Sequence, residues 1–375
     1  MPRRLWSFLL AVAVMLAASG AGAADIVIGF ANPLIGPYAS SAARNRFAVE
    51  LAIHDLNDQG GVLGQEVVVI TVNDACGVAR AAAAAQELVD AGVAFVVGHF
   101  CSHSSLMAAG VYEAADVLMI TPSSTHPRLT EEGRRNVFRL HGRDDRQGQL
   151  AGDFLADGWP DKAIAILHDG SIYGEGLAAE TRKRLRQWGV TEAIYDSYTP
   201  GAKDHSALVA RLQRAGIAVL YIGGYGPDAG LIVRTARQRG DDHLQPIGSD
   251  GFGMDEFWIV AGLAGEGTIF TDRPDVRGQP EAAAVLAEFR ARGLGPRPRG
   301  IGAYAAVQVW AQAVERAGSV DLAAVAGALR HGRFDTVLGR VAFDDRGDLT
   351  GAAWQWQVWT NGDHKPLKPR GAEDG

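Results

Sequence analysis

We predict an α/β protein with two lobes, each built on a parallel β-sheet that helices cover on both faces. Short continuous apolar runs alternate with helical patterns along almost the whole chain after residue 24, which is typical of parallel strands buried on both faces. The same architecture starts again after segment 139–148. The chain has 375 residues, of which 47% are hydrophobic, and this is enough for more than one core.

We expect residues 1–23 to be a signal peptide. Arg3 and Arg4 precede an apolar run, and the small residues at 21–23 suit a signal peptidase. The apolar run is too short for a comfortable membrane span. No cysteine stands at the expected cut near Ala24 to accept a lipid, so we predict release of the free chain into the periplasm.

The first lobe is expected to begin with four strands separated by helices. The expected strands cover 25–31, 66–72, 93–99 and 117–122, and the helices cover 47–61, 79–92 and 104–116. In the first helix Val49, Ile53 and Leu56 fall on one face, and Gly60 is well placed as the helix stop.

A second run of strands and helices follows segment 139–148. The expected strands cover 163–169, 192–199, 218–224, 245–250 and 267–272, with helices over 174–189, 205–216 and 228–240. This repetition predicts a second parallel sheet.

The final part of the chain changes character. Two helices are expected over 280–293 and 304–318, followed by paired strands over 339–345 and 352–360 that a hairpin turn at 344–349 connects. Trp354, Trp356 and Val358 alternate along one face of the last strand. We expect them to pack in the core rather than to form a ligand platform.

The only two cysteines, Cys76 and Cys101, each follow an apolar strand pattern and so fall at the same edge of the first sheet. In an oxidising periplasm we expect them to form a disulfide. His99 and His103 flank Cys101, so a metal site is an alternative, although no suitable third ligand is evident. An activated thiol is the other alternative, but a bridged sulfur cannot serve as one.

Charge and motif content argue against several classes of function. The formal net charge is −7, which is unfavourable for binding nucleic acid or an anionic membrane. The signatures GxSxG, HExxH, GxxxxGK[ST] and CxxC do not occur, and we predict no catalytic residue, no cofactor and no metal. Residues 224–229 match a relaxed dinucleotide pattern, but no acidic residue ends a convincing next strand.

Polar side chains gather where strands of both lobes end. Ligands bind outside the carboxyl ends of parallel strands, and the first lobe offers hydroxyls and helix N-termini there, at Ser102 and at 122–125, which suit a carboxylate. The second lobe offers Tyr173, Tyr225 and Asp250, of which Asp250 could pair with an ammonium. Helix capping by the hydroxyls and Asp250 and ordinary packing of the tyrosines are the alternatives.

The chain resembles the periplasmic binding proteins of the Leu/Ile/Val type, which serve ABC importers. The resemblance runs from segment 25–42 to segment 334–351 and is closest at 72–105, 118–130, 164–178 and 220–237. It implies the type I periplasmic binding protein fold, with two Rossmann-like lobes and three hinge crossovers. The N-terminal lobe would comprise 24–143 and 274–350, and the C-terminal lobe 144–273 and 351–375.

The resemblance also implies roles for individual residues. Cys76 and Cys101 would form the family's disulfide. Ser102, Ser123 through its backbone, and Thr125 would hold the carboxylate and ammonium of an amino acid. Tyr173 and Tyr225 match the tyrosines of the second lobe, and Asp250 stands where the family often has a glutamate that binds the ammonium.

The departures from the family concern the pocket for the ligand's side chain. Where branched-chain binders have an aromatic residue shortly after the first Gly-Pro, this chain has Ser41, with Tyr38 directly after Gly36-Pro37. Near 296–304, where the family has another aromatic residue, the chain has Arg299 or Gly300. The residues for the α-amino and carboxylate groups therefore match the family better than the apolar wall does.

We therefore predict a monomeric receptor of an ABC importer, with no enzymatic activity. Its partners would be an amino acid, first of all leucine, isoleucine or valine, and an inner-membrane permease complex. A binding protein for an amide, an aromatic acid or another small metabolite is the main alternative. An exported hydrolase is less well supported, because no nucleophile and base pair is visible.

Overall fold

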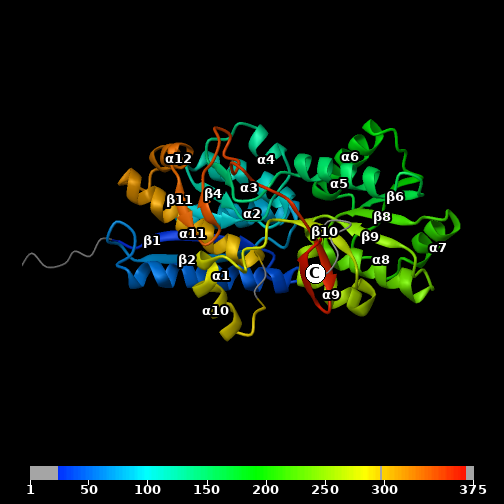
Figure 1. The fold of residues 1–375 in the computed structure, drawn as a ribbon. Coiled ribbons are helices and arrows are strands. Elements are labelled where there is room, and N and C mark those ends of the chain that lie inside the picture. The colour runs from blue at the N-terminus through cyan, green and yellow to red at the C-terminus, as the bar shows by residue number, and fades with distance from the viewer. Residues whose placement is uncertain (1–23, 296–297, 369–375) are drawn as a thin grey trace, which may run out of the picture.

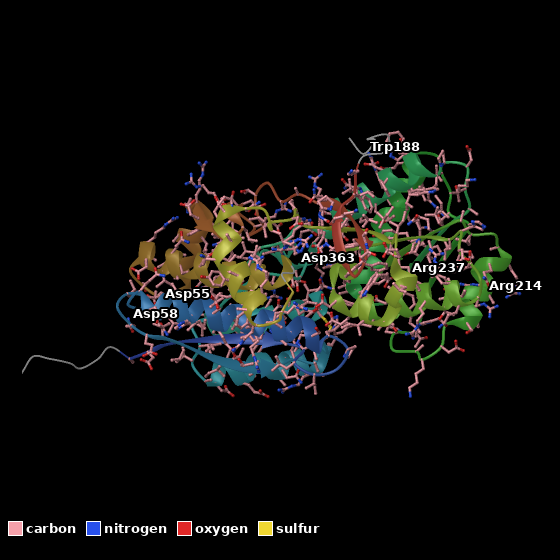
Figure 2. The ribbon with its side chains drawn as sticks, turned by 60° about the horizontal axis from the view of Figure 1, so that its bottom comes forward. Asp55, Asp58, Trp188, Arg214, Arg237 and Asp363 are labelled. Carbon is pink, nitrogen blue, oxygen red and sulfur yellow. A yellow bond between two sulfur atoms is a disulfide. The ribbon has the colours of Figure 1, made fainter. Side chains whose placement is uncertain are left out.

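The computed structural model describes residues 24–295 and 298–368. Two α/β bodies lie side by side, and each is built around its own sheet (Figure 1). Charged side chains project from the outer surface of both bodies, among them Asp58 on one and Arg214 on the other (Figure 2). Within the described ranges, no helix combines the length and apolar character that a membrane span needs. The expected signal peptide lies outside these residues.

The first sheet is entirely parallel. Its strand order is β2 (Val67–Asn73), β1 (Ile26–Asn32), β3 (Phe95–Gly98), β4 (Leu118–Thr121) and β5 (Val137–Arg139). One face packs against α1 (Ala39–Asp58), α10 (Ala283–Ala291), α11 (Pro298–Ala317) and α12 (Leu322–His331). The other face packs against α2 (Val78–Asp90) and α3 (Ser102–Ala114). The short helix α4 (Arg128–Glu131) precedes β5.

The second sheet has a parallel part and an antiparallel edge. Its order is β14 (Asp363–Pro366), β13 (Gln355–Thr360), β10 (Ile269–Asp272), β9 (Gln245–Gly248), β8 (Val219–Gly223), β6 (Ile164–His168) and β7 (Ile194–Ser197). β13 and β14 pair antiparallel. One face packs on α5 (Asp144–Gly158) and α6 (Ile172–Gln187), the other on α7 (Ser206–Arg214), α8 (Gly226–Gln238) and α9 (Asp255–Ala261). The 3₁₀ turns η1 (Asp250–Gly253), η2 (Gly262–Gly265) and η3 (Pro280–Ala282) complete the elements.

The chain crosses between the two bodies three times: from β5 to α5, from β10 to α10, and on the way to β13. Buried polar contacts fix these crossings. Arg139, at the first crossing, donates from Nε to Asp348 Oδ1, at the third, over 2.9 Å. Arg273, at the second, donates from Nη2 to the carbonyl oxygen of Pro122 over 2.8 Å. The predicted fold class, with two parallel sheets and three crossovers, is confirmed.

The predicted hairpin between 339–345 and 352–360 is wrong. β12 (Gly339–Val341) pairs with β11 (Phe334–Thr336) in a separate two-stranded sheet, and β13 pairs with β10 and β14. The turn itself exists, because Phe343 and Leu349 form an isolated antiparallel bridge around it. The turn lies at the third crossing. The strands on its two sides therefore belong to different bodies and pair with different strands.

Two further differences concern the packing of the tryptophans and the start of the first helix. Trp356 does pack against the core, with its ring 4.1 Å from that of Phe154. Among the described tryptophans, the one with no exposed surface is Trp359, on the opposite face of β13. Both faces of the sheet are covered, so alternation does not identify the more buried one. Helix α1 begins at Ala39 rather than at residue 47, because its first turns carry small and polar residues that give no apolar periodicity.

Candidate ligand-binding site

The six residues predicted to bind a ligand lie where strands of the two sheets end, and all are buried. Their exposed fractions are 2% for Ser102, 6% for Ser123, 1% for Thr125, 3% for Tyr173, 8% for Tyr225 and 2% for Asp250. The two bodies meet over them: Phe100 and Cys101 of the first body share one apolar cluster with Tyr173, Leu177, Tyr225 and Met254 of the second.

In the first body, Ser102 joins the ends of two strands. Its Oγ accepts from the backbone N–H of Thr125 at 3.3 Å and from that of His126 at 3.4 Å. Ser102 thus bonds to the loop after β4, and it does not cap its own helix, whose N-cap is Cys101. Ser123 donates its N–H to Thr121 Oγ1 at 3.2 Å, which leaves its carbonyl oxygen as the backbone group able to meet a ligand.

In the second body, the Tyr173 hydroxyl joins three groups. It donates its one proton to Asp250 Oδ1 at 2.5 Å and accepts from the N–H of Gly251 at 3.0 Å, and its oxygen lies 2.9 Å from Ser249 Oγ. The carboxylate of Asp250 is therefore oriented by a tyrosine and does not cap a helix. The alternative in which the tyrosine hydroxyl points into water does not hold for Tyr173.

Aromatic rings pack between the polar residues of the first body and those of the second. The ring of Tyr225 lies 4.9 Å from that of Tyr173 and 5.1 Å from that of Tyr38, which comes from the loop before α1. Phe100, beside the disulfide, lies 6.1 Å from Tyr38 and 6.4 Å from Tyr225. Tyr38 thus packs with Phe100 and Tyr225 between the two bodies.

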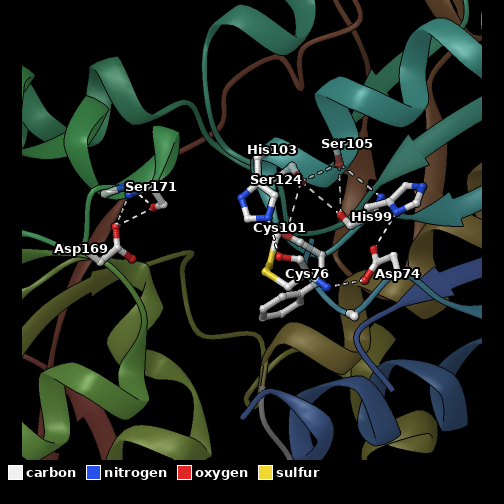
Figure 3. Close-up of a disulfide and its surroundings, with 12 residues drawn as sticks. Asp74, Cys76, His99, Cys101, His103, Ser105, Ser124, Asp169 and Ser171 are labelled. Atoms are coloured by element: carbon white, nitrogen blue, oxygen red, sulfur yellow. Dashed lines mark hydrogen bonds and ion pairs between the residues drawn. A yellow bond between two sulfur atoms is a disulfide. The ribbon is translucent and has the colours of Figure 1, made fainter. Parts of the chain in front are cut away.

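Cys76 and Cys101 form a disulfide, with Cα atoms 5.6 Å apart, as predicted (Figure 3). The flanking histidines make hydrogen bonds within the protein. His99 Nδ1 lies 2.6 Å from Asp74 Oδ2, and His103 Nε2 lies 2.6 Å from the carbonyl oxygen of Cys76. Cys76, Cys101 and His103 are close enough to share an ion, but both sulfurs are bonded to each other, so neither is a thiolate ligand.

Sequence reasoning missed two residues in the first turn of α5, which follows the first crossing. Gln147 donates from Nε2 to Asp250 Oδ1 at 3.0 Å, and Asp144 donates its backbone N–H to the carbonyl oxygen of Thr125 at 3.0 Å. Burial raises the pKa of the Asp144 carboxyl well above its usual range, and the nearby carboxylate of Asp250 raises it further. Segment 139–148 reads as a polar connection, but it follows a strand, and that position was the available signal.

The first turns of α1 also reach across to α9 of the second body. Ser41 donates from its N–H and from Oγ to the two carboxylate oxygens of Glu256, each over 2.8 Å. Arg44 pairs with Asp255 one residue earlier. The side chain of Arg299, which was a second candidate for the side-chain pocket, lies outside the described residues, whereas Gly300 is buried against Phe289.

A groove of about 740 Å³ runs between the bodies beside the disulfide. His103 and Met107 line it from one side, and Asp169 and Ser171 line it from the other. Among the described residues that line it, none belongs to the six predicted to bind a ligand. The groove is therefore separate from the six buried residues that are predicted to bind a ligand.

A sequence profile described as "Periplasmic binding protein" matches residues 25–363. A Brucella suis protein named Leu/Ile/Val-binding protein homolog 1 is 39% identical over 94% of this chain and 95% of its own length. A Pseudomonas aeruginosa protein named leucine-, isoleucine-, valine-, threonine-, and alanine-binding protein is 40% identical over 92% of this chain and 93% of its own.

Solved structures show the same arrangement of the two bodies. The leucine binding protein LivK of Thermotoga maritima has a TM-score of 0.84 at 26% identity, covering 92% of this chain and 98% of its own. LivJ of Streptococcus pneumoniae, a branched-chain amino acid transporter substrate binding protein in complex with isoleucine, has a TM-score of 0.83 at 25% identity, covering 92% and 100%. With the profile match and the relatives at 39% and 40% identity, these similarities establish that the chain belongs to the periplasmic binding protein family.

Proposed function

We propose that this protein is the receptor of an ABC importer, which captures a branched-chain amino acid between its lobes and delivers it to a membrane permease. The observation that carries the proposal is the match, over more than nine-tenths of the chain, to relatives named for binding leucine, isoleucine and valine. The family consists of binding proteins rather than enzymes. The signal sequence would place the receptor in the periplasm, where it acts as a monomer.

The buried set supplies both halves of an amino-acid site. Ser102, the Ser123 carbonyl and Thr125 would hold the carboxylate and part of the ammonium from the first lobe. Tyr173, Tyr225 and Asp250 would close over them from the second, with Asp250 on the ammonium. The membership of the strands in the two sheets supports a first lobe of 24–143 with 274–350 and a second of 144–273 with 351–375.

The walls around this site support an aliphatic side chain of modest size. Tyr38, Phe100 and Tyr225 present aromatic rings within about 6 Å of one another. Ser41, at the position of the missing aromatic residue, is held by Glu256 and so has both its donors occupied. The pocket would keep an apolar lining from the three rings.

A thermal-shift screen of residues 24–375 tests the proposal, after unfolding and refolding to remove carried-over ligand. Ligand binding to the folded state raises the unfolding midpoint by mass action, so leucine, isoleucine and valine should each raise it by several degrees. Shifts only with polar or acidic amino acids would reject the branched-chain ligand. Shifts only with amides or aromatic acids would reject the amino-acid receptor altogether.

A further inference from the structure

The side chain of His126 lies at a contact between the two bodies. His126 belongs to the loop that follows β4 in the first body. Its ring packs against Gly176 of α6 in the second body, because a Cβ atom added to this glycine would lie only 3.2 Å from both Nε2 and Cδ2 of the ring. The missing side chain at Gly176 lets the two bodies approach closely here, and their separation would expose the ring to water.

The other nitrogen of the His126 ring already accepts a hydrogen bond. The backbone N–H of Arg128 donates to Nδ1 at 3.3 Å, so the neutral ring carries its proton on Nε2. A proton added to Nδ1 would face the N–H of Arg128, and the packing on Gly176 hinders the ring from turning away. The contact between the bodies therefore favours the neutral ring over the charged one.

The charged groups around His126 are mostly positive. They are Arg128 and Glu131 of α4, Arg139 of β5 and Arg143 directly before α5. Of the adjoining helices, α6 carries the exposed Glu175, and α3 carries His103, which is bonded to the carbonyl oxygen of Cys76. Burial, with the arginines, lowers the pKa of His126 to about 4.

We propose that His126 is an acid-sensitive switch of lobe closure, whose protonation separates the two bodies and releases the ligand. The proposal rests on the proposed function, in which closure captures the ligand. In the open form the ring would be exposed and would have an ordinary pKa of about 6.5. The closed form takes up the proton less readily than the open form. Closure should therefore be undisturbed above about pH 6.5, weaken as the pH falls from there, and level off near pH 4.

The test measures leucine affinity by calorimetry at pH 7.5 and pH 5 in the parent, in His126→Asn and in His243→Asn. Asparagine keeps an acceptor near the place of Nδ1 but does not take up a proton. His243 is exposed, so its variant is the matched control and should behave as the parent does.

Parent and His126→Asn should bind leucine alike at pH 7.5. At pH 5 an exposed histidine is mostly charged, so the parent should bind leucine about tenfold or more weakly than His126→Asn. Carboxyl groups that titrate in this range, Asp144 included, are present in both proteins, and their effect cancels in this comparison.

The variant Gly176→Ala tests the contact itself. The added methyl group would press on the His126 ring in the closed form, so this variant should bind leucine more weakly than the parent at pH 7.5. Combining it with His126→Asn, which has a smaller side chain, should restore most of the affinity. Equal affinity of Gly176→Ala and the parent would show that the ring is not held between the bodies.

Small-angle scattering of the ligand-free protein separates this proposal from the choice of ligand. The radius of gyration of the parent should increase from pH 7.5 to pH 5 by more than that of His126→Asn. Equal pH dependence of the two proteins, in affinity or in radius, would overturn the switch. If the parent bound no leucine but its radius changed as expected, the proposed ligand would fail and the switch would stand.

Discussion

At the scale of single residues, Asp250 is the acidic group that the second lobe offers to the proposed ligand. Asp250→Ala should reduce amino-acid affinity by several kcal/mol, because it leaves the ammonium unpaired in a closed cleft. Calorimetry with leucine would measure the loss, with Asp242→Ala, an exposed neighbour, as control. Unchanged affinity in Asp250→Ala would contradict the role given to this residue.

The raised pKa of Asp144 gives the affinity for an amino acid a definite pH dependence. A carboxylate beside the proposed site attracts an ammonium only when it is ionised, whereas burial and Asp250 favour the protonated form of Asp144. Affinity should therefore be full at high pH and decline as the pH falls through the raised pKa. Asp144→Asn should flatten the decline. An unchanged profile in the variant would mean that another group titrates.

How far the site could be predicted also depends on individual residues. Ser102, Tyr173 and Asp250 each directly follow a recognisable strand pattern or lie near one, so the rule on strand ends finds them. Asp144 and Gln147 lie in a polar segment without periodicity, and only the chain's return to the site at the first crossing brings Gln147 to Asp250. Their position after β5 was the available signal, but the partner that each residue meets is set by long-range packing, which local sequence does not report.

At the scale of elements, the disulfide fixes the loop after β2 to the start of α3. In the chain-entropy account, closing a loop of this length stabilises by roughly 3 kcal/mol. The double variant Cys76→Ser, Cys101→Ser should lower the free energy of unfolding by about this amount in urea titrations. Dithiothreitol should destabilise the parent but not the variant, and equal sensitivity of the two would contradict this account.

The strands and helices themselves were largely predictable, because parallel strands buried on both faces leave short apolar runs. β6, β8 and β10 all lie within their predicted ranges. The hairpin was wrong because local turn chemistry at 344–349 is real, whereas the partner of each flanking strand is set by which lobe it reaches. Tertiary packing decides which strands pair when they lie far apart in the sequence, and a turn motif carries no information about that packing.

At the scale of the whole molecule, the contacts from α1 to α9 hold the two lobes together at one side of the cleft. Glu256→Ala would remove both hydrogen bonds to Ser41 without touching a proposed ligand contact. Hydrogen bonds to a charged group contribute roughly 1.5–3 kcal/mol each. Losing two of them should weaken closure by about 3 kcal/mol or more, so leucine should dissociate on the order of a hundredfold faster.

Small-angle scattering and stopped-flow fluorescence would check this prediction, with Glu288→Ala on the exposed face of α10 as control. The ligand-free variant should have a larger radius of gyration than the parent, and saturating leucine should restore the parent's value. An unchanged radius together with an unchanged dissociation rate would show that α1 and α9 do not control closure.

The most direct test of the central claim is a crystal structure of the refolded protein grown with leucine. The account predicts one leucine enclosed between the lobes, with its carboxylate on Ser102 and Thr125 and its ammonium on Asp250. Leucine bound instead in the groove beside the disulfide, or a cleft that stays empty at saturating leucine, would contradict it.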